Sequence, residues 1–356
     1  MRKIFLILTT LAIWTGTSSA QPQALKIGVI SSLTGEAAKW GKYQNMGITL
    51  AHEELRAQGL DISLIFEDSQ TKAVKVISAY NKFVGLDHVD AVISNDFGFV
   101  TAPVIPIVAR EKRMLVSTGL PLDRYCKEGG GHFFTITSHF KESYAAYEQF
   151  FKLHPEVRQI ALVIFDDQEW GLTYRGIWEE LARKYKVNIV DVLLSTEWTP
   201  DYKSWFTKIS SKGVQAIFIA HEPVTFHKAR RQFNFKGSVV SANNVFEMLV
   251  DAPARPELND VYLADPVISA GFRDKFEQRF KVAPILEAYV GYEALRALVK
   301  AFELNEKHPE LGMKQVRYRG VAGEIDFTGT SCSGNQAEWG FFQFQGGKVF
   351  QVPMKQ

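Results

Sequence analysis

Several groups of residues in this chain carry chemically useful side chains, but none has the spacing that catalysis requires. Asp166, Asp167 and Glu169 form an acidic cluster without a metal-ligand pattern, and the histidines show no HExxH-type spacing. The glycines at 129–131 lead into an expected strand instead of a helix, which argues against a phosphate cradle. A GxSxG elbow is also missing from the sequence. We therefore expect no enzyme, no catalytic or metal-binding residue and no cofactor.

Aromatic side chains beside expected turns offer a different chemistry, which is the non-covalent binding of a small molecule. Trp40 and Trp170 each follow a polar loop and precede a glycine, a position that favours a cleft. Phe97 and Phe99 either extend such a wall or belong to the core, and Asp96 is either a ligand-facing acid or a turn residue. Sites for small molecules combine apolar walls with a few placed polar groups. The four rings are therefore candidate ligand contacts.

Two polar residues, His221 and Glu222, stand at the end of another expected strand, directly before Pro223. Ligands of open α/β sheets lie outside the carboxyl ends of the strands, which is where both residues are expected. They are either contacts to a ligand or ordinary loop residues, and the sequence leaves both interpretations open.

Strands and helices alternate along the chain, which predicts parallel sheets covered by helices on both faces. The pattern runs from residue 25 to residue 117 and starts again at residue 159, which indicates two α/β units in tandem. No linker rich in proline, glycine or serine separates them, so we expect continuous crossover strands, the first over residues 132–136. Expected strands cover 25–30, 61–66, 91–94, 114–117, 159–165, 188–193, 216–220, 239–241, 339–344 and 348–352, and expected helices cover 46–55, 74–83, 103–113, 170–186, 202–212, 225–233 and 288–306.

The amino-terminal residues predict export. Arg2 and Lys3 precede an apolar stretch over 4–13, and small residues over 18–20 fit a cleavage site, so residues 1–20 are expected to be a signal peptide. The chain has 41 basic and 39 acidic residues, and cleavage removes the two basic residues of the leader, which leaves a balanced charge. No long basic run occurs, so nucleic acid is not an expected partner.

Four segments of this sequence stand out by their order and spacing: the loop over 31–41, residues 103–119, the DDQEWG segment over 166–171 and the GEIDF segment over 323–327. Together they resemble the periplasmic solute-binding proteins of the branched-chain amino-acid type, which serve ABC importers. The resemblance implies an α/β fold of two doubly wound lobes joined by three crossovers, with the ligand in the cleft (a type I periplasmic binding protein). It also implies an N-terminal lobe of residues 24–134 plus 267–323 and a C-terminal lobe of residues 135–266 plus 324–356.

The sequence departs from this family where amino-acid binders hold the α-carboxylate and the ammonium group. Residues 98–100 read Gly-Phe-Val where the family has hydroxyls, and Leu120 and a proline follow Gly119 where a Thr-type donor is usual. The acidic residue expected after the strand over 239–241 is missing, and Asn243 stands near that place. Charged groups are expensive to bury without partners. We therefore expect a ligand other than a free branched-chain amino acid, and we favour an aromatic or apolar carboxylate.

The resemblance also implies a role and a set of contacts. The implied function is that a monomer captures a small molecule in the periplasm and delivers it to an ABC transporter permease in the inner membrane. The alternative is a ligand-sensing partner of a membrane receptor or kinase, because the same lobes also serve as sensory domains. The candidate ligand-binding residues are Trp40, Phe97, Gly98, Phe99, Gly119, Leu120, Trp170, His221, Glu222 and Asn243.

The chain has two cysteines, Cys126 and Cys332. Proteins of oxidising compartments keep disulfides, so one bond is compatible with export. The family layout puts Cys126 just before the first crossover and Cys332 in a turn near the third. Both cysteines would then approach the hinge, and we expect them to form a disulfide.

Overall fold

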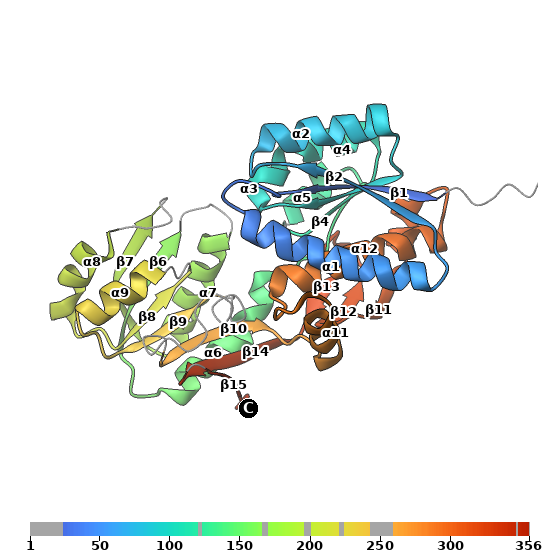
Figure 1. Cartoon of the computed structure of the whole chain (residues 1–356). Helices are drawn as coiled ribbons and strands as arrows, with labels where there is room; N and C mark the ends of the chain where they lie inside the picture. Colours follow the sequence, from blue (N-terminus) through green and yellow to red (C-terminus); the bar gives the residue numbers. More distant parts are fainter. Residues whose placement is uncertain are drawn as a thin grey trace, which may run out of the picture.

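The computed structural model describes residues 24–119, 123–165, 170–195, 201–220, 224–242, 259–346 and 348–355. Within these residues the chain forms two α/β lobes, each built on a mainly parallel sheet that is covered by helices (Figure 1). The predicted fold class, two doubly wound α/β lobes, is therefore confirmed.

The first lobe is built on a five-stranded sheet with the order β2–β1–β3–β4–β5, in which all neighbours are parallel. Helices cover both faces, so the strands are short apolar runs, and all five residues of β3 are buried. The register aligns Ile27 with Ala91 and Ile93 with Val116. The strands are β1 (Leu25–Ser31), β2 (Ile62–Asp68), β3 (Ala91–Asn95), β4 (Leu115–Ser117) and β5 (Phe133–Thr135).

Helices from both ends of the chain cover the first sheet (Figure 1). The helices α1 and α12 pack so closely that two glycines are required between them. A Cβ at Gly47 would overlap the Ala288 carbonyl, and a Cβ at Gly291 would overlap the Gln44 carbonyl. This contact brings residues near 290 into the amino-terminal lobe. The helices are α1 (Ala38–Ala57), α2 (Ala73–Lys82), α3 (Gly98–Thr101), α4 (Ile105–Glu111), α5 (Asp123–Glu128), α11 (Ala270–Phe280), α12 (Leu286–Leu304) and α13 (Pro309–Met313).

The second lobe is built on a seven-stranded sheet with the order β15–β14–β10–β9–β8–β6–β7. Its strands are parallel except for β14 and β15, which form the hairpin predicted from the sequence. The elements are β6 (Gln159–Phe165), β7 (Asn188–Ser195), β8 (Ala216–Ile219), β9 (Ser238–Ser241), β10 (Val261–Pro266), β14 (Trp339–Gln345), β15 (Lys348–Val352), α6 (Tyr144–Leu153), α7 (Trp170–Lys184), α8 (Tyr202–Ile209) and α9 (Val224–Gln232).

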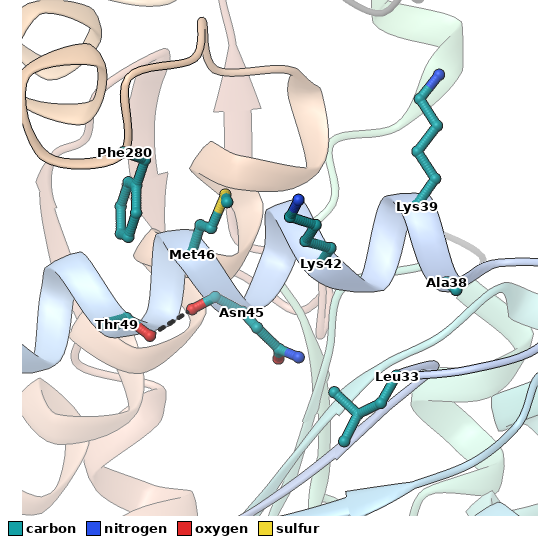
Figure 2. Close-up of a pocket in the computed structure, with 8 residues that line it drawn as sticks. All are labelled: Leu33, Ala38, Lys39, Lys42, Asn45, Met46, Thr49 and Phe280. Carbon is teal, nitrogen blue, oxygen red and sulfur yellow. Dashed lines mark hydrogen bonds between the residues drawn. The ribbon is translucent and has the colours of Figure 1, made fainter.

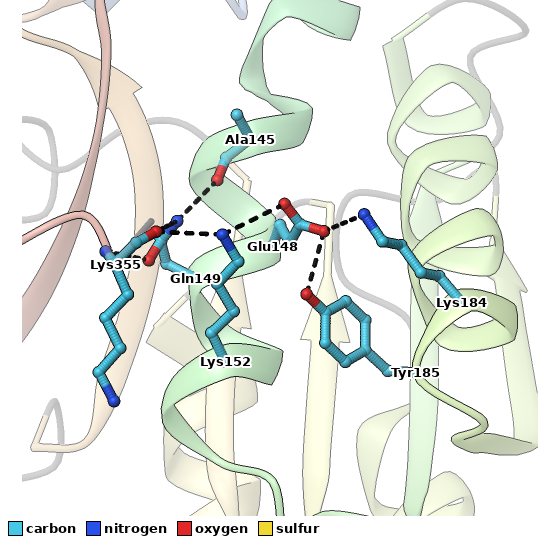
Figure 3. Close-up of polar contacts among 7 residues, drawn as sticks. All are labelled: Ala145, Glu148, Gln149, Lys152, Lys184, Tyr185 and Lys355. Atoms are coloured by element: carbon cyan, nitrogen blue, oxygen red, sulfur yellow. Dashed lines mark hydrogen bonds and ion pairs between the residues drawn. The ribbon is translucent and has the colours of Figure 1, made fainter.

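Polar contacts on α6 hold the carboxyl-terminal segment and α7 (Figure 3). The backbone N–H of Lys355 donates to Gln149 Oε1 at 2.7 Å, and Lys152 Nζ donates to the Lys355 carbonyl at 3.0 Å. The Glu148 carboxylate, directly before Gln149 in α6, accepts hydrogen bonds from Lys184 and from the Tyr185 hydroxyl. The last described residues are thereby fixed to the helix that covers β10 and β14.

A small antiparallel sheet, β11 (Arg317–Arg319), β12 (Gly323–Asp326) and β13 (Asn335–Ala337), lies between α12 and the segments that pass between the lobes. The chain passes from one lobe to the other after β5, after β10 and before β14. The lobe boundaries expected from the sequence remain a prediction.

Most expected elements are present, with shifts of a few residues at their ends. Five helices (α3, α5, α6, α11 and α13) and four strands (β10, β11, β12 and β13) were not expected from the sequence. Two expected loops also differ, because α1 already begins at Ala38 and the short helix α3 lies within residues 95–101. Further short helical turns lie over Phe83–Asp87, Ala102–Val104, Phe140–Ser143 and Ser210–Lys212.

Candidate ligand-binding site

Trp40 and Trp170 occupy equivalent places in the two lobes. Each lies in the first turn of the helix that follows the first strand of its sheet, namely α1 after β1 and α7 after β6. A Cβ at Gly41 would overlap the Ser32 carbonyl oxygen, and a Cβ at Gly171 would overlap the Phe165 carbonyl oxygen. Glycine therefore lets both helix starts touch the end of the preceding strand, which fixes each indole at a carboxyl edge.

In the first lobe, three rings form what we call the aromatic wall: Trp40, Phe97 and Phe99. The Trp40 and Phe97 rings meet edge to face with centroids 5.4 Å apart, and Phe97 stacks with Phe99 at 5.8 Å. The Phe99 side chain remains 53% exposed, although a phenylalanine of this size is usually buried. The wall thus presents apolar ring surface at the edge of the sheet where α/β proteins bind ligands.

Two predicted glycines lie beside this wall. Gly98 is the first residue of α3, and Phe97 precedes it in an extended conformation. A Cβ at Gly119 would overlap the Asp96 carbonyl oxygen and would lie 3.5 Å from the Gly98 nitrogen. The segments after β3 and β4 are therefore in direct contact, and a larger residue at position 119 would push them apart.

The hydroxyls near the wall are occupied by contacts within the protein. Ser94 and Thr101 are fully buried and lie 2.9 Å apart, oxygen to oxygen. Thr118 Oγ1 accepts from Gln44 Nε2 at 3.0 Å, and Ser117 Oγ accepts from the Gly119 N–H at 3.2 Å. These side chains serve to join strands and helices, so they present no open row of hydroxyls to a charged ligand.

A cluster that the sequence did not reveal lies beneath the wall, at the ends of three strands. We call it the acid–hydroxyl cluster: Ser32, Ser69, Thr71 and Asp96. Ser32 and Ser69 both donate to Asp96 Oδ1, the latter at 3.0 Å, and Thr71 Oγ1 lies 3.1 Å from Ser32 Oγ. Asp96 is 3% exposed, and within the described residues its second oxygen has no hydrogen-bond partner. Burial raises the pKa of Asp96 to about 6, and the two hydroxyls offset only part of this effect.

Trp170 has a different environment in the second lobe. Its ring meets Tyr174 edge to face at 5.7 Å, and Tyr174 in turn stacks on Trp178 at 5.6 Å. Tyr174 and Trp178 are both completely buried. Trp170 is therefore the half-buried end of an aromatic core, and its predicted position opposite Trp40 across a cleft remains a prediction.

Four predicted contacts, Leu120, His221, Glu222 and Asn243, lie outside the described residues, as does the acidic cluster over 166–169. Among the residues that the structure covers, no three His, Cys, Asp or Glu side chains gather as a metal site. No helix in the described ranges is long and apolar enough to cross a membrane.

A hollow of about 570 Å³ is lined by α1, by Leu33 after β1 and by Phe280 at the end of α11 (Figure 2). Its side chains recur three and four positions apart along the helix, so they lie on one face. Neither the three rings of the wall nor Trp170 lines this hollow. The lining residues are Leu33, Ala38, Lys39, Lys42, Asn45, Met46, Thr49 and Phe280.

The predicted disulfide is confirmed. Cys126 in α5 and Cys332 are bonded, with their Cα atoms 5.2 Å apart. The Thr135 N–H at the end of β5 donates to the Cys332 carbonyl at 2.9 Å. The disulfide therefore links α5 to the segment around Cys332. This segment lies beside the end of β5, where the first connection between the lobes begins.

Comparison with known proteins agrees with this architecture. The sequence profile of the family described as "Periplasmic binding protein" matches residues 24–348. No curated protein matches the sequence.

Three solved structures share the fold. The branched-chain amino acid transporter substrate-binding protein LivJ from Streptococcus pneumoniae, in complex with isoleucine, is 19% identical with a TM-score of 0.80, covering 92% of this chain and 98% of that chain. A solute-binding protein of an ABC transporter from R. palustris, in complex with benzoate, is 16% identical with a TM-score of 0.77, covering 92% and 95%. A second one, from Rhodopseudomonas palustris BisB5 in complex with 3,4-dihydroxybenzoic acid, is 14% identical with a TM-score of 0.79, covering 92% and 96%.

At these identities the structural likeness carries the fold alone, whereas the family profile takes in almost all of the described sequence. The two-lobed fold and the profile agree with each other. The chain belongs to the periplasmic binding protein family, which is a family of binding proteins and not of enzymes.

Proposed function

We propose that this protein is an exported solute-binding protein that captures an aromatic or otherwise apolar carboxylate between its lobes. It acts as a monomer in the periplasm, after loss of residues 1–20, and delivers the ligand to an ABC transporter permease in the inner membrane. The family assignment and the ABC transporter proteins among the structural neighbours support this role.

The observation that carries the ligand class is the aromatic wall. Trp40, Phe97 and Phe99 offer contiguous ring surface, and Phe99 is 53% exposed. A ligand ring stacked on such a surface gains roughly 0.5–1.5 kcal/mol beyond the burial of its area. Two of the structural neighbours were solved with benzoate and 3,4-dihydroxybenzoic acid, which supports the same class.

The polar groups around the wall argue against a free amino acid, although one neighbour was solved with isoleucine. An amino acid brings an ammonium and a carboxylate, and a site must pair both charges when it removes them from water. The hydroxyls of Ser94, Thr101 and Thr118 are engaged in internal hydrogen bonds and are at most 3% exposed. A ligand with a single charge needs fewer partners, and it suits this site better.

A positive charge stands at the rim of the wall. Lys39 Nζ lies 5.9 Å from the centre of the Trp40 ring, next to it on α1. Gly98, Gly119 and Trp170 are further proposed contacts, as are Leu120, His221, Glu222 and Asn243.

Isothermal titration calorimetry tests the ligand class. Benzoate and 3,4-dihydroxybenzoate are compared with leucine, isoleucine and valine, on protein refolded to remove any retained ligand. We expect binding of at least one aromatic acid and none of the three amino acids at micromolar concentration. Micromolar binding of leucine, isoleucine or valine would contradict the proposed class, and native mass spectrometry of freshly purified protein would then identify what it retains.

Small-angle scattering tests the binding-protein role independently of the ligand's identity. Closure of two lobes on a ligand is a hinge motion and makes the molecule more compact. The radius of gyration should therefore fall when a ligand found by calorimetry is added to saturation. An unchanged radius at saturation would argue against capture by closure.

A further inference from the structure

Two of the three connections between the lobes form backbone hydrogen bonds with one short turn over residues 320–323. The Ser269 N–H, in the connection after β10, donates to the Val321 carbonyl at 2.8 Å. The Glu338 N–H, in the connection before β14, donates to the Ala322 carbonyl at 2.8 Å. The two connections also bind each other, because the Val267 N–H donates to the Glu338 carbonyl at 2.8 Å. The turn is therefore the place where both connections leave the first lobe.

One buried carboxylate holds this turn. Glu293 lies in the middle of α12 and is completely buried. Its Oε1 accepts from the Val321 N–H at 2.7 Å, and its Oε2 accepts from the Tyr318 hydroxyl at 2.7 Å. Burial raises the pKa of Glu293, but the Arg296 guanidinium, 3.6 Å from Oε2, acts in the opposite direction. The Arg296 side chain also packs over the rings of Tyr292 and Tyr318, at 5.2 and 5.0 Å.

We propose that Glu293 is a positioning residue for the movement of the lobes, because its carboxylate fixes on α12 the turn from which two of the three connections start. The contacts form a continuous chain from the α12 helix, through Glu293 and Val321, to Ser269 in the second connection. A parallel chain runs through Ala322 to Glu338 in the third. The inference rests on the lobe movement of the proposed function, but it does not depend on which ligand is bound.

A purely structural role for Glu293 predicts something different. Removal of a buried carboxylate leaves its hydrogen-bond donors without an acceptor and lowers stability wherever the carboxylate lies in a protein. A positioning residue must in addition restrict the orientation of the lobes before any ligand is present. The orientation of the lobes in the unliganded protein therefore distinguishes the two roles.

The experiment measures the distance between spin labels on the two lobes by double electron–electron resonance, in the full mature chain without ligand. The labels are placed at Val74→Cys in α2 and Lys228→Cys in α9, and both native residues are exposed. The native disulfide remains oxidised and does not react. The variants are Glu293→Ala, the conservative Glu293→Gln, and Asp191→Ala as a control. Asp191 is a partly buried carboxylate of the second lobe that accepts from Trp205 Nε1 at 2.8 Å and pairs with Lys208 at 2.8 Å.

We expect Glu293→Ala to broaden the distance distribution at least twofold. Glu293→Gln should restore most of the parent width, since it keeps an acceptor for the Val321 N–H. Asp191→Ala should lower the melting temperature and leave the distribution narrow. A parent-like width in Glu293→Ala, or equal broadening in Asp191→Ala, would overturn the proposal. If Glu293→Ala does not fold, Glu293→Asp decides in the same way, because the shorter side chain withdraws the carboxylate from the Val321 N–H.

A failure here is distinguishable from a failure of the proposed function. The distance measurement uses no ligand, so a wrong ligand class leaves its outcome unchanged. Conversely, calorimetry that finds an aromatic acid bound to the parent would support the function even if the distribution of Glu293→Ala stays narrow.

Discussion

Trp40 and Trp170 occupy the same place in their lobes, yet their neighbours differ. Trp40 packs on the core of its lobe and also meets Phe97, which stacks on the exposed Phe99. Trp170 meets Tyr174, which is completely buried and stacks on the buried Trp178. The strand-to-helix step thus places an indole at the edge of the sheet, but the residues around it determine whether the ring forms a wall or ends a core.

The same contrast holds for the carboxylates of the two lobes. Asp96 accepts hydrogen bonds from two hydroxyls, and burial, with a smaller contribution from the negative charge of Asp68, raises its pKa to about 6. Asp191 is only partly buried, and hydrogen bonds from Lys208 and Trp205 outweigh the effect of burial and lower its pKa. The first lobe thus holds a carboxyl group that is poorly compensated beside its proposed site, whereas the second lobe pairs its acid with cations.

The largest expected difference between the lobes comes from the disulfide. Replacing both Cys126 and Cys332 by serine releases a loop with a sequence separation of 206 residues. The chain-entropy description gives on the order of 5 kcal/mol for such a loop, as an upper figure. Scanning calorimetry should show that the transition of the first lobe moves to lower temperature while the aromatic core of the second lobe unfolds as before. A single transition that shifts as a whole would show that the lobes unfold together.

The two carboxylates should respond to pH with opposite signs. The Asp96 pKa is raised in the folded protein, so ionisation of this carboxyl group lowers the free energy of unfolding. The loss of stability is absent below about pH 4, grows as the pH rises, and is fully present above about pH 6. Asp96→Asn should therefore raise the free energy of unfolding by about 3 kcal/mol at pH 7.5 and leave it unchanged at pH 4. Urea titrations at several pH values measure this. An equal effect of Asp96→Asn at both pH values would contradict it.

The matched control in the second lobe is Asp191→Asn. Its folded-state pKa is lowered, so its stabilisation is present above the unfolded-state pKa and is lost as the pH falls through the folded-state value. The variant should be less stable than the parent at pH 7.5, with a difference that shrinks on acidification. A gain in stability at pH 7.5 would remove the contrast between the two lobes.

The two tryptophans should separate binding from stability. Trp170→Ala should cost about 1–2 kcal/mol of stability, less than a fully buried ring, because it uncovers the Tyr174 face of the core. Trp40→Ala should cost less stability and weaken benzoate binding roughly threefold to tenfold. Melting temperature and calorimetry are measured on both variants. If both bind benzoate as tightly as the parent, neither ring contacts the ligand.

The smallest effect on stability is expected at Phe99. Its ring is 53% exposed, so Phe99→Ala should change the free energy of unfolding by less than about 0.5 kcal/mol. Benzoate binding should nevertheless weaken about threefold, because the wall loses one face. Leu86→Ala is the control, since Leu86 is 75% exposed and lies at the end of the turn after α2, away from the wall. Equal binding by Phe99→Ala and the parent would limit the wall to Trp40 and Phe97.

Many of the elements that were predicted from the sequence bury a large share of their residues. The strand β3 is buried at every position, and α12 buries most of its residues. Burial alone was not sufficient, because β10 is also buried at every position and α6 buries half of its residues, and neither was predicted. The helix α11 is largely polar and α5 has six residues, so neither has a distinct period. Tertiary contacts hold these helices, and such contacts cannot be seen in a local pattern.

The candidate site was predicted in part for a similar reason. Trp40 and Phe97 could be found because each follows one strand and the ends of parallel strands share an edge. The acid–hydroxyl cluster could not be found, because Ser32, Ser69 and Asp96 come from three strands. Their hydrogen bonds depend on the order β2–β1–β3, which the sequence does not specify.

The glycines after the two tryptophans have a consequence for how such a protein can change over evolution. At Gly41 and Gly171 the helix start touches the strand, so any larger residue there would displace the backbone. The preceding positions, 40 and 170, have no such backbone overlap and carry the indoles that we propose as ligand contacts. A change of ligand preference through these two positions would therefore leave the frame that presents them unchanged.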